Sequence, residues 1–361
     1  MKIFLVCNSL GGGGAERVHV NLANGFAQRG HEVYLVADIH QKTSYSVDEK
    51  VHILPLCPKT NNKLQKWGKA IFWLRKNIKR HHPDVVIGNM YLCTFLSRLA
   101  ALGLDVPVLL TIHHALESET YRISPLIKKL DKYAPKFFAR TIVLTEADKV
   151  FMKSANGNEV SAIPNPLSFA PCENLPMKDK FILAAGRLDD LMCKGWDILF
   201  DAWGKVASKH KDWNLYLAGT GSEESIRVIT GFVKKNNIED QVKLLGFRND
   251  IKDLYLRASI FVLSSRSEGL PMVLIEAMSQ GCACVATDYK GRTREIISSH
   301  EEGLLCEPEN VDAFANNIEK LIVDEDLRHS IQKKSIERSK SFSINNVISI
   351  WESVLHDFCR K

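Results

Sequence analysis

The stretch KIFLVCNSLGGGGAERV, residues 2–18, joins an apolar run to four consecutive glycines. The run at 2–7 favours a buried β-strand, so the glycines at 11–14 fall in the loop at its carboxyl end. In doubly wound sheets, ligands bind at such loops because the next helix presents free backbone N–H groups there. The glycines therefore indicate a close approach of a ligand to the backbone, with a simple tight turn as the alternative.

Short apolar runs alternate with helical patterns along the whole chain. We expect strands at 2–7, 33–37, 51–56, 84–88, 107–112, 141–145 and 160–163, then at 181–186, 213–218, 241–246, 260–264, 283–286 and 303–306. Near-continuous apolar strands separated by helices indicate parallel sheets covered on both faces. Two such series predict an α/β protein with two doubly wound, Rossmann-like domains.

The connector between the two series is predicted at 163–179, where four prolines disfavour a helix. We therefore expect one domain over 1–168 and a second over 169–341. The last segment, 342–361, is predicted to be a helix, because apolar residues recur in it at helical spacing: Val347, Ile350, Trp351, Val354, Leu355 and Phe358.

The charge of the chain is unevenly distributed. The net charge is +6 over 361 residues, but residues 1–170 carry +9 and the remainder −3. A basic first half suggests a polyanionic partner or an anionic membrane surface, and solvated lysine-rich faces are the alternative. Nucleic acid is not expected as the partner, since no nucleic-acid-binding motif is present.

Nine cysteines, none in CxxC spacing, predict reduced and mostly buried thiols in a cytosolic protein without a metal cluster. The apolar start is too short for a signal peptide, and no window is long enough to span a membrane. We therefore expect a cytoplasmic protein that binds at most peripherally to the inner face of the plasma membrane.

The glycine loop does not match a dinucleotide-binding fingerprint. Counting G-x-G-x-x-G from Gly11 places Glu16 at the third glycine position, and counting from Gly12 places Arg17 there. Asp38, at the end of the second expected strand, superficially supports such a site. An NAD-dependent oxidoreductase therefore remains only as an alternative.

The segment RSEGLPMVLIEAMSQG, residues 266–281, follows an expected strand and opens a helix. Pro271 suits the first helical turn, which leaves the N–H groups of residues 272–274 for a ligand. Gly269 admits a phosphate, whereas the Glu268 carboxylate accepts hydrogen bonds from sugar hydroxyls. Glu276, two turns along, lies near a ribose diol or, alternatively, faces water.

Two cations follow strands of the same domain. Arg187 lies directly after the strand at 181–186, and Lys194 follows after six further residues. Each alone is more simply a surface charge, but together with the loop at 268–276 they form a plausible anion pocket. Glycine loops at 217–224 and 287–296 follow other strands of the domain.

In this setting the chain resembles the retaining glycosyltransferases of family 4 over nearly its whole length. The segment EGLPMVLIE matches the E-x7-E motif of that family. Other matching segments occur in the family's order: GGGGAER, IPNP, GRL…KG, AGTGSEE, LLGF and TDYKGRTREII. The resemblance implies the GT-B fold, in which two Rossmann-like domains face a central cleft and the C-terminal helix crosses back to the N-terminal domain.

The resemblance also implies roles for single residues. Glu268 would bind the donor sugar and Glu276 the ribose, while Arg187 and Lys194 would stabilise the departing diphosphate. His113, or its neighbour His114, would contact the donor sugar near the reacting carbon. The remaining donor-binding positions would be Gly13, Gly14, Gly269, Leu270, Pro271, Met272 and Val273.

One departure from the family concerns Lys194, because LDDLMC puts six residues after Arg187 where the family has about four. LDD also lacks the spacing of a metal-binding DxD, so no metal and no cofactor beyond the nucleotide-sugar co-substrate is expected. Positively charged side chains can stabilise the negative charge that develops on a leaving diphosphate, as a bound metal ion would.

The acceptor would bind the basic first half. Residues 61–82 and 124–140 are lysine-rich, and Leu64, Trp67, Ile71, Leu74 and Ile78 form one helical stripe. A basic amphipathic helix can lie on anionic lipid, but such a stripe can also pack on its own sheet.

These features lead us to expect a metal-independent, retaining hexosyltransferase. Its donor would be a hexose or N-acetylhexosamine nucleoside diphosphate, with a UDP-sugar favoured. Its acceptor would be a glycan or a polyprenyl- or lipid-linked sugar in polysaccharide, capsule, lipopolysaccharide O-antigen or glycolipid assembly. A sugar-nucleotide epimerase of similar shape and a non-catalytic membrane-surface scaffold are the further alternatives.

Overall fold

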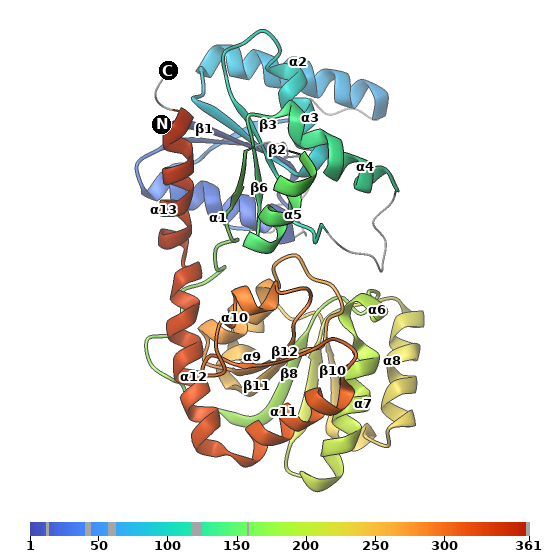
Figure 1. Ribbon diagram of the computed structural model, residues 1–361. Helices are drawn as coiled ribbons and strands as arrows, with labels where there is room; N and C mark the ends of the chain where they lie inside the picture. Colours follow the sequence, from blue (N-terminus) through green and yellow to red (C-terminus); the bar gives the residue numbers. More distant parts are fainter. Residues whose placement is uncertain (12–13, 40–44, 57–62, 117–124, 157–158, 359–361) are drawn as a thin grey trace. The chain divides into compact units, whose positions relative to one another are not determined.

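The computed structural model describes residues 1–11, 14–39, 45–56, 63–116, 125–156 and 159–358. These residues form two compact units (Figure 1). Unit 1 contains the described residues up to Ser168 together with those from Ile344 onward, and unit 2 spans Phe169–Ser343.

Unit 1 is built on a seven-stranded sheet of order β3-β2-β1-β4-β5-β6-β7 in which every pairing is parallel. Its strands are β1 (Lys2–Ser9), β2 (Glu32–Asp38), β3 (His52–Pro55), β4 (Val85–Asn89), β5 (Val108–Thr111), β6 (Arg140–Val143) and β7 (Val160–Ala162). The central strands are buried throughout because helices cover both faces.

Two apolar clusters form the core of unit 1, one on each face of the sheet. Helices α2 (Lys63–His81) and α3 (Met90–Ala100) supply one cluster, and α1 (Gly14–Gln28) and α13 (Ile344–Leu355) supply the other. Helices α4 (Pro125–Tyr133) and α5 (Glu146–Asn156), with the short 3-10 helix η1 (Ala134–Phe137), complete the unit.

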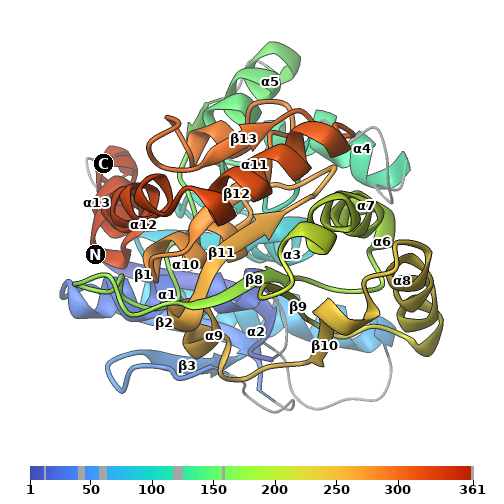
Figure 2. The same cartoon turned by 90° about the horizontal axis from the view of Figure 1, so that it is seen from below.

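Unit 2 repeats the design with six parallel strands in the order β10-β9-β8-β11-β12-β13 (Figure 2). They are β8 (Asp179–Ala185), β9 (Asn214–Ala218), β10 (Val242–Gly246), β11 (Ala258–Leu263), β12 (Ala283–Thr287) and β13 (Leu304–Cys306). Each of the thirteen expected strands is therefore confirmed in the part of the chain that the structure describes.

The helices of unit 2 are α6 (Leu191–Lys194), α7 (Trp196–Val206), α8 (Glu223–Lys235), α9 (Ile251–Arg257), α10 (Met272–Ser279), α11 (Val311–Val323) and α12 (Glu325–Ser339). Helices α7, α8 and α11 pack into one large core with the strands, around fully buried residues such as Trp203 and Phe314. Helix α10 packs against α12 on strand β12.

The C-terminal helix α13 belongs to unit 1. Trp351 of α13 meets Phe26 of α1 edge-to-face at a centroid distance of 6.3 Å, and both rings are buried. At the helix surface, Glu352 accepts hydrogen bonds from Arg29 at 3.2 Å and from His31 at 3.0 Å. Apolar burial, more than the exposed ion pairs, holds the helix on this unit.

The stripe predicted on α2 faces the core. Leu74 and Ile78 are buried, and Trp67 and Ile71 pack against the same cluster. The packing alternative is thus correct for these four residues, while the side chain of Leu64 lies outside the described residues. Among the helices that the structure describes, none has the length and apolarity to cross a membrane.

Candidate functional site

An ion pair marks the carboxyl edge of the sheet in unit 2. The Nζ atom of Lys194 lies 2.7 Å from Oε1 of Glu268, and the Ser265 hydroxyl donates to the same oxygen at 2.7 Å. The side chains of Lys194 and Glu268 are only 18% and 14% exposed. The two residues that the sequence analysis assigned to diphosphate and sugar are therefore adjacent.

The turn that carries Lys194 is held against the end of β11. Gly195 adopts a left-handed conformation, with φ of 61°, and a β-carbon there would lie 2.1 Å from the Ser264 carbonyl oxygen. The Ser264 hydroxyl donates to the Lys194 carbonyl at 2.9 Å, and the Cys193 carbonyl accepts from the Arg266 backbone N–H at 2.8 Å. Only glycine fits position 195, so the turn and the loop after β11 form one piece.

The charges of the pair are mutually dependent. Burial disfavours the positive charge of Lys194 and is the largest single effect, but the Coulomb attraction and the hydrogen bond of Glu268, with smaller contributions from Cys193 and Asp190, together raise the pKa of the ammonium group. Lys194 therefore stays cationic at physiological pH, as a residue facing a phosphate must. The longer loop after Arg187 still brings the lysine to the carboxylate.

Arg187 does not join this pair. Its guanidinium is 81% exposed and lies 2.7 Å from Oδ2 of Asp190, three residues along the same loop. The Arg187 carbonyl accepts a hydrogen bond from the indole N–H of Trp196 at 3.3 Å. The backbone of Arg187 is thus fixed, while its side chain extends from the strand end into solvent.

The glycine loop after β9 supports the Arg187 loop. A β-carbon on Gly219 would lie 1.8 Å from the Gly186 carbonyl oxygen, so a side chain is excluded there. Asp189 accepts hydrogen bonds from the Ser222 N–H, the Ser222 hydroxyl and the Ser225 hydroxyl, each at 2.8 Å. The glycines at 219–221 therefore serve packing between two loops.

Helix α10 begins one residue later than expected, because Pro271 is its N-cap. The Leu274 N–H donates to the Pro271 carbonyl at 3.0 Å, so its expected availability for a ligand is wrong. Pro271 and Leu270 are buried, and Gly269, Met272 and Val273 are half-buried at the helix start.

Glu276 is buried within unit 2, with 4% of its surface exposed. The alternative that this residue faces water is therefore wrong. A buried carboxylate costs free energy unless it is hydrogen-bonded or paired, so its position about one turn into α10 is not that of an ordinary surface glutamate.

A second polar cluster lies at the carboxyl edge of the sheet in unit 1. Gly14 is the first residue of α1, whereas Gly13 lies outside the described residues. His113 follows β5, and its Nε2 atom is 3.2 Å from the Thr111 hydroxyl. The His19 ring, fully buried on α1, meets the His113 ring edge-to-face at 5.8 Å.

The histidines of this cluster are neutral. Burial, with a smaller contribution from His19, lowers the pKa of His113 to about 3, although a hydrogen bond with Asn165 acts in the opposite direction. Burial likewise lowers the pKa of His19 to about 4. His113 can therefore donate or accept a hydrogen bond, but it does not carry a positive charge near pH 7.

His114, the alternative to His113, has a different environment. Its Nε2 atom lies 3.1 Å from Oδ1 of Asp131 on α4, and the Tyr91 hydroxyl donates to the same carboxylate oxygen. His114 thus connects the strand end to α4. Asp38, which superficially supported a dinucleotide site, is buried and lies 2.8 Å from the Lys66 ammonium group.

Comparisons with known proteins identify the family of the chain. The family model described as Glycosyltransferase Family 4 matches residues 12–169, and the one described as Glycosyl transferases group 1 matches residues 170–338. An uncharacterized glycosyltransferase of Haemophilus influenzae is 31% identical over 98% of this chain and 99% of its own length. The chain belongs to glycosyltransferase family 4.

This family 4 glycosyltransferase is also similar to a named bacterial glycosyltransferase and to a solved structure. A Campylobacter jejuni α-1,4-N-acetyl-D-galactosaminyltransferase, named for an undecaprenol diphosphate-linked acceptor, is 27% identical, with 97% of each chain covered. The solved structure of Anabaena HepE in complex with UDP-glucose matches with a TM-score of 0.77 at 20% identity, covering 99% of this chain and 100% of HepE. The fold of the glycosyltransferase is accordingly GT-B.

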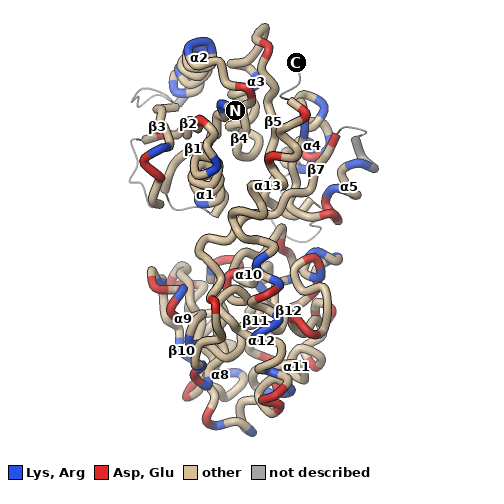
Figure 3. Tube along the Cα trace, turned by 90° about the vertical axis from the view of Figure 1, so that its left-hand side faces the viewer, with Lys and Arg blue, Asp and Glu red and all other residues tan. Residues whose placement is uncertain are grey.

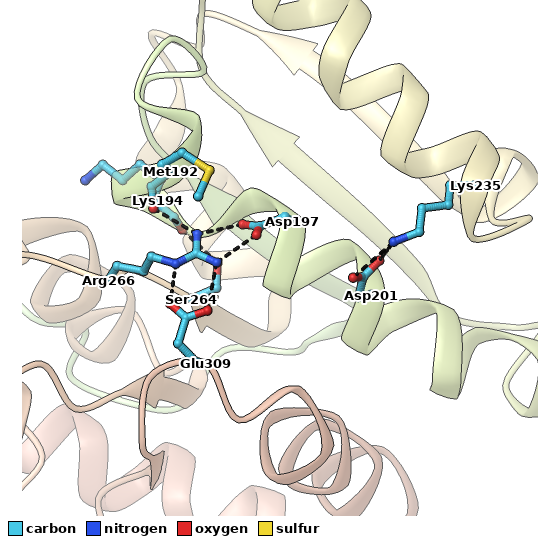
Figure 4. A network of polar contacts seen from close by, with 8 residues as sticks. All are labelled: Met192, Lys194, Asp197, Asp201, Lys235, Ser264, Arg266 and Glu309. Atoms are coloured by element: carbon cyan, nitrogen blue, oxygen red, sulfur yellow. Dashed lines mark hydrogen bonds and ion pairs between the residues drawn. The ribbon is translucent and has the colours of Figure 1, made fainter. Parts of the chain in front are cut away.

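The sequence analysis missed one part of this glycosyltransferase, the polar network around Arg266 (Figure 4). Arg266 lies two residues before Glu268 and forms a bidentate pair with Asp197, with both distances 2.7 Å. It also pairs with Glu309 and donates to the Met192 carbonyl at 3.0 Å. The sequence offered one indication of this network, an arginine two residues before the motif residue Glu268.

The structure also bears on metal binding by this glycosyltransferase. Within the described ranges, no group of three or more His, Cys, Asp or Glu side chains is arranged to hold a metal ion. The seven cysteines that the structure describes are free thiols, and five of them are buried, among them Cys7, Cys284 and Cys306. Cys57 lies outside the described residues.

Proposed function

We propose that this glycosyltransferase transfers a hexose or N-acetylhexosamine from a UDP-sugar to a polyprenyl diphosphate-linked or glycan acceptor. The product would be a building block of cell-envelope polysaccharide, O-antigen, capsule or glycolipid. The proposal further assigns retention of the anomeric configuration and no requirement for a metal ion. The observation that carries it is the Lys194–Glu268 pair at the carboxyl edge of the sheet in unit 2.

The pair combines the two chemistries that a nucleotide-sugar requires. A cation stabilises the negative charge that develops on the departing diphosphate, and a carboxylate accepts hydrogen bonds from sugar hydroxyls. Lys194 is nearly buried and its pKa is raised, so its charge acts in a medium of low dielectric constant, where it is more effective than in water. Arg187 would supply a second, exposed cation from the neighbouring loop.

The names of similar proteins support the choice of donor and acceptor. The Campylobacter relative transfers N-acetylgalactosamine to an undecaprenol diphosphate-linked sugar, and HepE binds UDP-glucose. The basic character of the first half of this chain fits an anionic, diphosphate-containing acceptor.

Retention in this scheme requires no protein nucleophile. The acceptor hydroxyl would attack from the face that the diphosphate leaves, and a diphosphate oxygen would take its proton. The neutral imidazole of His113 suits a hydrogen bond near the reacting carbon, because a cation there would oppose the positive charge that develops on the sugar ring.

The experiment compares Glu268→Ala and Lys194→Met with the wild type in transfer from UDP-glucose, UDP-galactose and their N-acetyl analogues, with and without EDTA. A short-chain polyprenyl diphosphate sugar serves as the acceptor. Both variants should lose at least about 100-fold in kcat, as when one transition-state hydrogen bond is removed. Glu337→Ala, which removes an exposed glutamate of α12 that pairs with Lys340, is the matched control.

The outcomes separate the alternatives. Activity that survives Glu268→Ala would refute the assignment of the site, and loss of wild-type activity in EDTA would refute metal independence. Stabilisation by NADH, but by no nucleoside diphosphate, in a thermal unfolding assay would favour the oxidoreductase. If no ligand shifts the melting temperature and no product forms, the non-catalytic scaffold becomes the better description.

The same proposal includes peripheral attachment to the inner face of the plasma membrane through unit 1. Phe72 projects from α2 with 67% of its surface exposed, and Lys69 and Lys76 of the same helix are exposed as well. Lysine and arginine positions recur along α2 (Figure 3). Helix α3 packs against α2, and its Arg98 donates to the Phe137 carbonyl of η1 at 3.0 Å. Phe137 is itself 60% exposed, so unit 1 presents exposed aromatic side chains on both α2 and η1.

Such a surface suits an anionic bilayer, since the aromatic ring enters the interface while lysines meet lipid phosphates. Sedimentation of the protein with vesicles that contain about 30% anionic lipid would test this attachment. Phe72→Ser should reduce the bound fraction, whereas Phe247→Ser, which changes an equally exposed ring of unit 2, should not. Equal binding of all three proteins would contradict attachment through α2.

A further inference from the structure

We propose that Arg266 is a positioning residue that holds the lengthened loop after β8 so that Lys194 reaches the diphosphate. This inference rests on the proposed function, because it assigns Lys194 to the donor. It concerns a side chain outside the family motifs, and it explains how the loop with two additional residues still places its lysine correctly.

Arg266 uses its whole hydrogen-bonding capacity. A guanidinium has five N–H donors, and all of them have partners in this structure. Nη1 serves Asp197 and the Met192 carbonyl, Nη2 serves Asp197 and Glu309, and Nε serves Glu309. The Arg266 side chain is only 10% exposed, and its two bonds to Asp197 are partly buried, whereas Glu309 on the other side is an exposed partner.

The five bonds connect separate parts of unit 2 (Figure 4). Met192 lies in α6, the short turn that ends at Lys194, while Asp197 is in the first turn of α7 on the other side of Gly195. Glu309 precedes α11 and has a positive φ of 66°, which is uncommon for a residue with a side chain. Arg266 therefore fixes the chain on both sides of the Lys194 turn.

Backbone contacts complete the attachment. The Arg266 N–H donates to the Cys193 carbonyl at 2.8 Å, and the Cys193 thiol donates to the Ser267 carbonyl at 3.2 Å. These bonds align the turn with the loop that ends in Glu268. Arg266 itself does not touch Lys194, so its effect on the lysine is exerted through the turn.

A lysine at position 266 cannot replace this fork. Its ammonium group has three donors and lacks the planar geometry for bidentate pairing. If the arginine served only as a positive charge between two carboxylates, Arg266→Lys would preserve its effect. If it positions the turn, Arg266→Lys should behave like Arg266→Met.

The test is a double-mutant cycle read out by UDP binding in isothermal titration calorimetry. Arg266→Met and Arg266→Lys should each weaken UDP binding at least tenfold in the otherwise wild-type protein. In the Lys194→Met background, Arg266→Met should add less than a twofold change. Lys235→Met is the matched control, because it removes an ion pair to Asp201 on the same α7 helix without touching the loop.

A second readout does not depend on the nucleotide. Burial, followed by the charge of Glu268, raises the pKa of the Cys193 thiol, which therefore reacts slowly in the intact turn. Alkylation of the Cys193 peptide by iodoacetamide, followed by mass spectrometry, should accelerate at least fivefold in Arg266→Met and remain unchanged in Lys235→Met. Glu309→Ala removes two of the five Arg266 bonds at an exposed partner and should increase the alkylation rate of Cys193 by a smaller factor. This milder variant keeps the test valid if Arg266→Met fails to fold.

The two hypotheses fail differently. If wild type and Lys194→Met bind UDP equally, the proposed role of Lys194 is wrong, whatever Arg266 does to Cys193. If Lys194→Met weakens binding but Arg266→Met weakens it by the same factor in both backgrounds, the positioning role is refuted. Unchanged Cys193 labelling in Arg266→Met would also overturn it.

Discussion

Replacing His19 should make unit 1 less sensitive to acid. His19 is fully buried on α1, and burial lowers its pKa from 6.5 to about 4. Its Nδ1 atom lies 3.3 Å from the Ala15 carbonyl oxygen, and no partner of Nε2 is found among the described residues. Leucine has a similar volume, so His19→Leu removes the titration without leaving a buried group unpaired.

The sign and size of the effect follow from linkage. The unfolded histidine binds a proton below pH 6.5, whereas the folded one stays neutral until about pH 4. Its contribution to stability is therefore complete above pH 6.5 and is lost as the pH falls toward 4. At pH 5 the loss is 1.5 pH units times 1.36 kcal/mol, or about 2 kcal/mol. This figure hardly depends on the folded pKa as long as that pKa is below 5.

Native-state hydrogen exchange of the β1 amides is the suitable assay, because it reports the opening of unit 1 separately from unit 2. Between pH 7 and pH 5, the opening free energy of His19→Leu should fall about 2 kcal/mol less than that of the wild type. His329→Leu, a change at an exposed histidine of α12, should follow the wild type. An identical acid sensitivity of His19→Leu and wild type would refute the reasoning, since His19 would then be protonated in the folded state.

Two further predictions concern packing. Trp351→Ala should destabilise unit 1 by about 3–5 kcal/mol, because it empties a buried site beside Phe26. Urea unfolding followed by circular dichroism measures the loss of stability, and a loss below about 1 kcal/mol would mean that α13 contributes little to the stability of unit 1. Gly219→Ala should weaken UDP binding and lower the melting temperature, because the new methyl group meets the Gly186 carbonyl, whereas Gly231→Ala, on α8 with open space around it, should leave both unchanged.

The fold was predictable because its strands are buried on both faces. Their sequences are short, continuous apolar runs, and such runs between helical stretches have few other interpretations. The errors are at the ends. Strand β1 continues to Ser9 and β11 begins at Ala258, and at both positions polar or small residues extend the hydrogen-bonded ladder beyond the apolar pattern.

The site was predictable only in part, for a physical reason. Glu268 and Lys194 could be chosen from the sequence because they lie in recognisable motifs. The ion pair between them could not be predicted, since it joins positions 74 residues apart. Arg187 looked equivalent to Lys194 in the sequence, yet its side chain pairs locally with Asp190 and remains exposed. Whether a cation is buried or solvated depends on tertiary packing, which a spacing rule does not contain.

The protonation state of a side chain is a further property that the sequence does not reveal, and it differs between the candidate residues of the two units. In unit 2 the cation Lys194 keeps its charge because Glu268 compensates for burial. In unit 1 burial lowers the pKa of both His19 and His113, and the neighbouring His19 lowers that of His113 further, so both imidazoles are neutral near pH 7. The charge that the proposed role of Lys194 requires therefore depends on its carboxylate partner, whereas the neutral ring of His113 can only donate or accept a hydrogen bond.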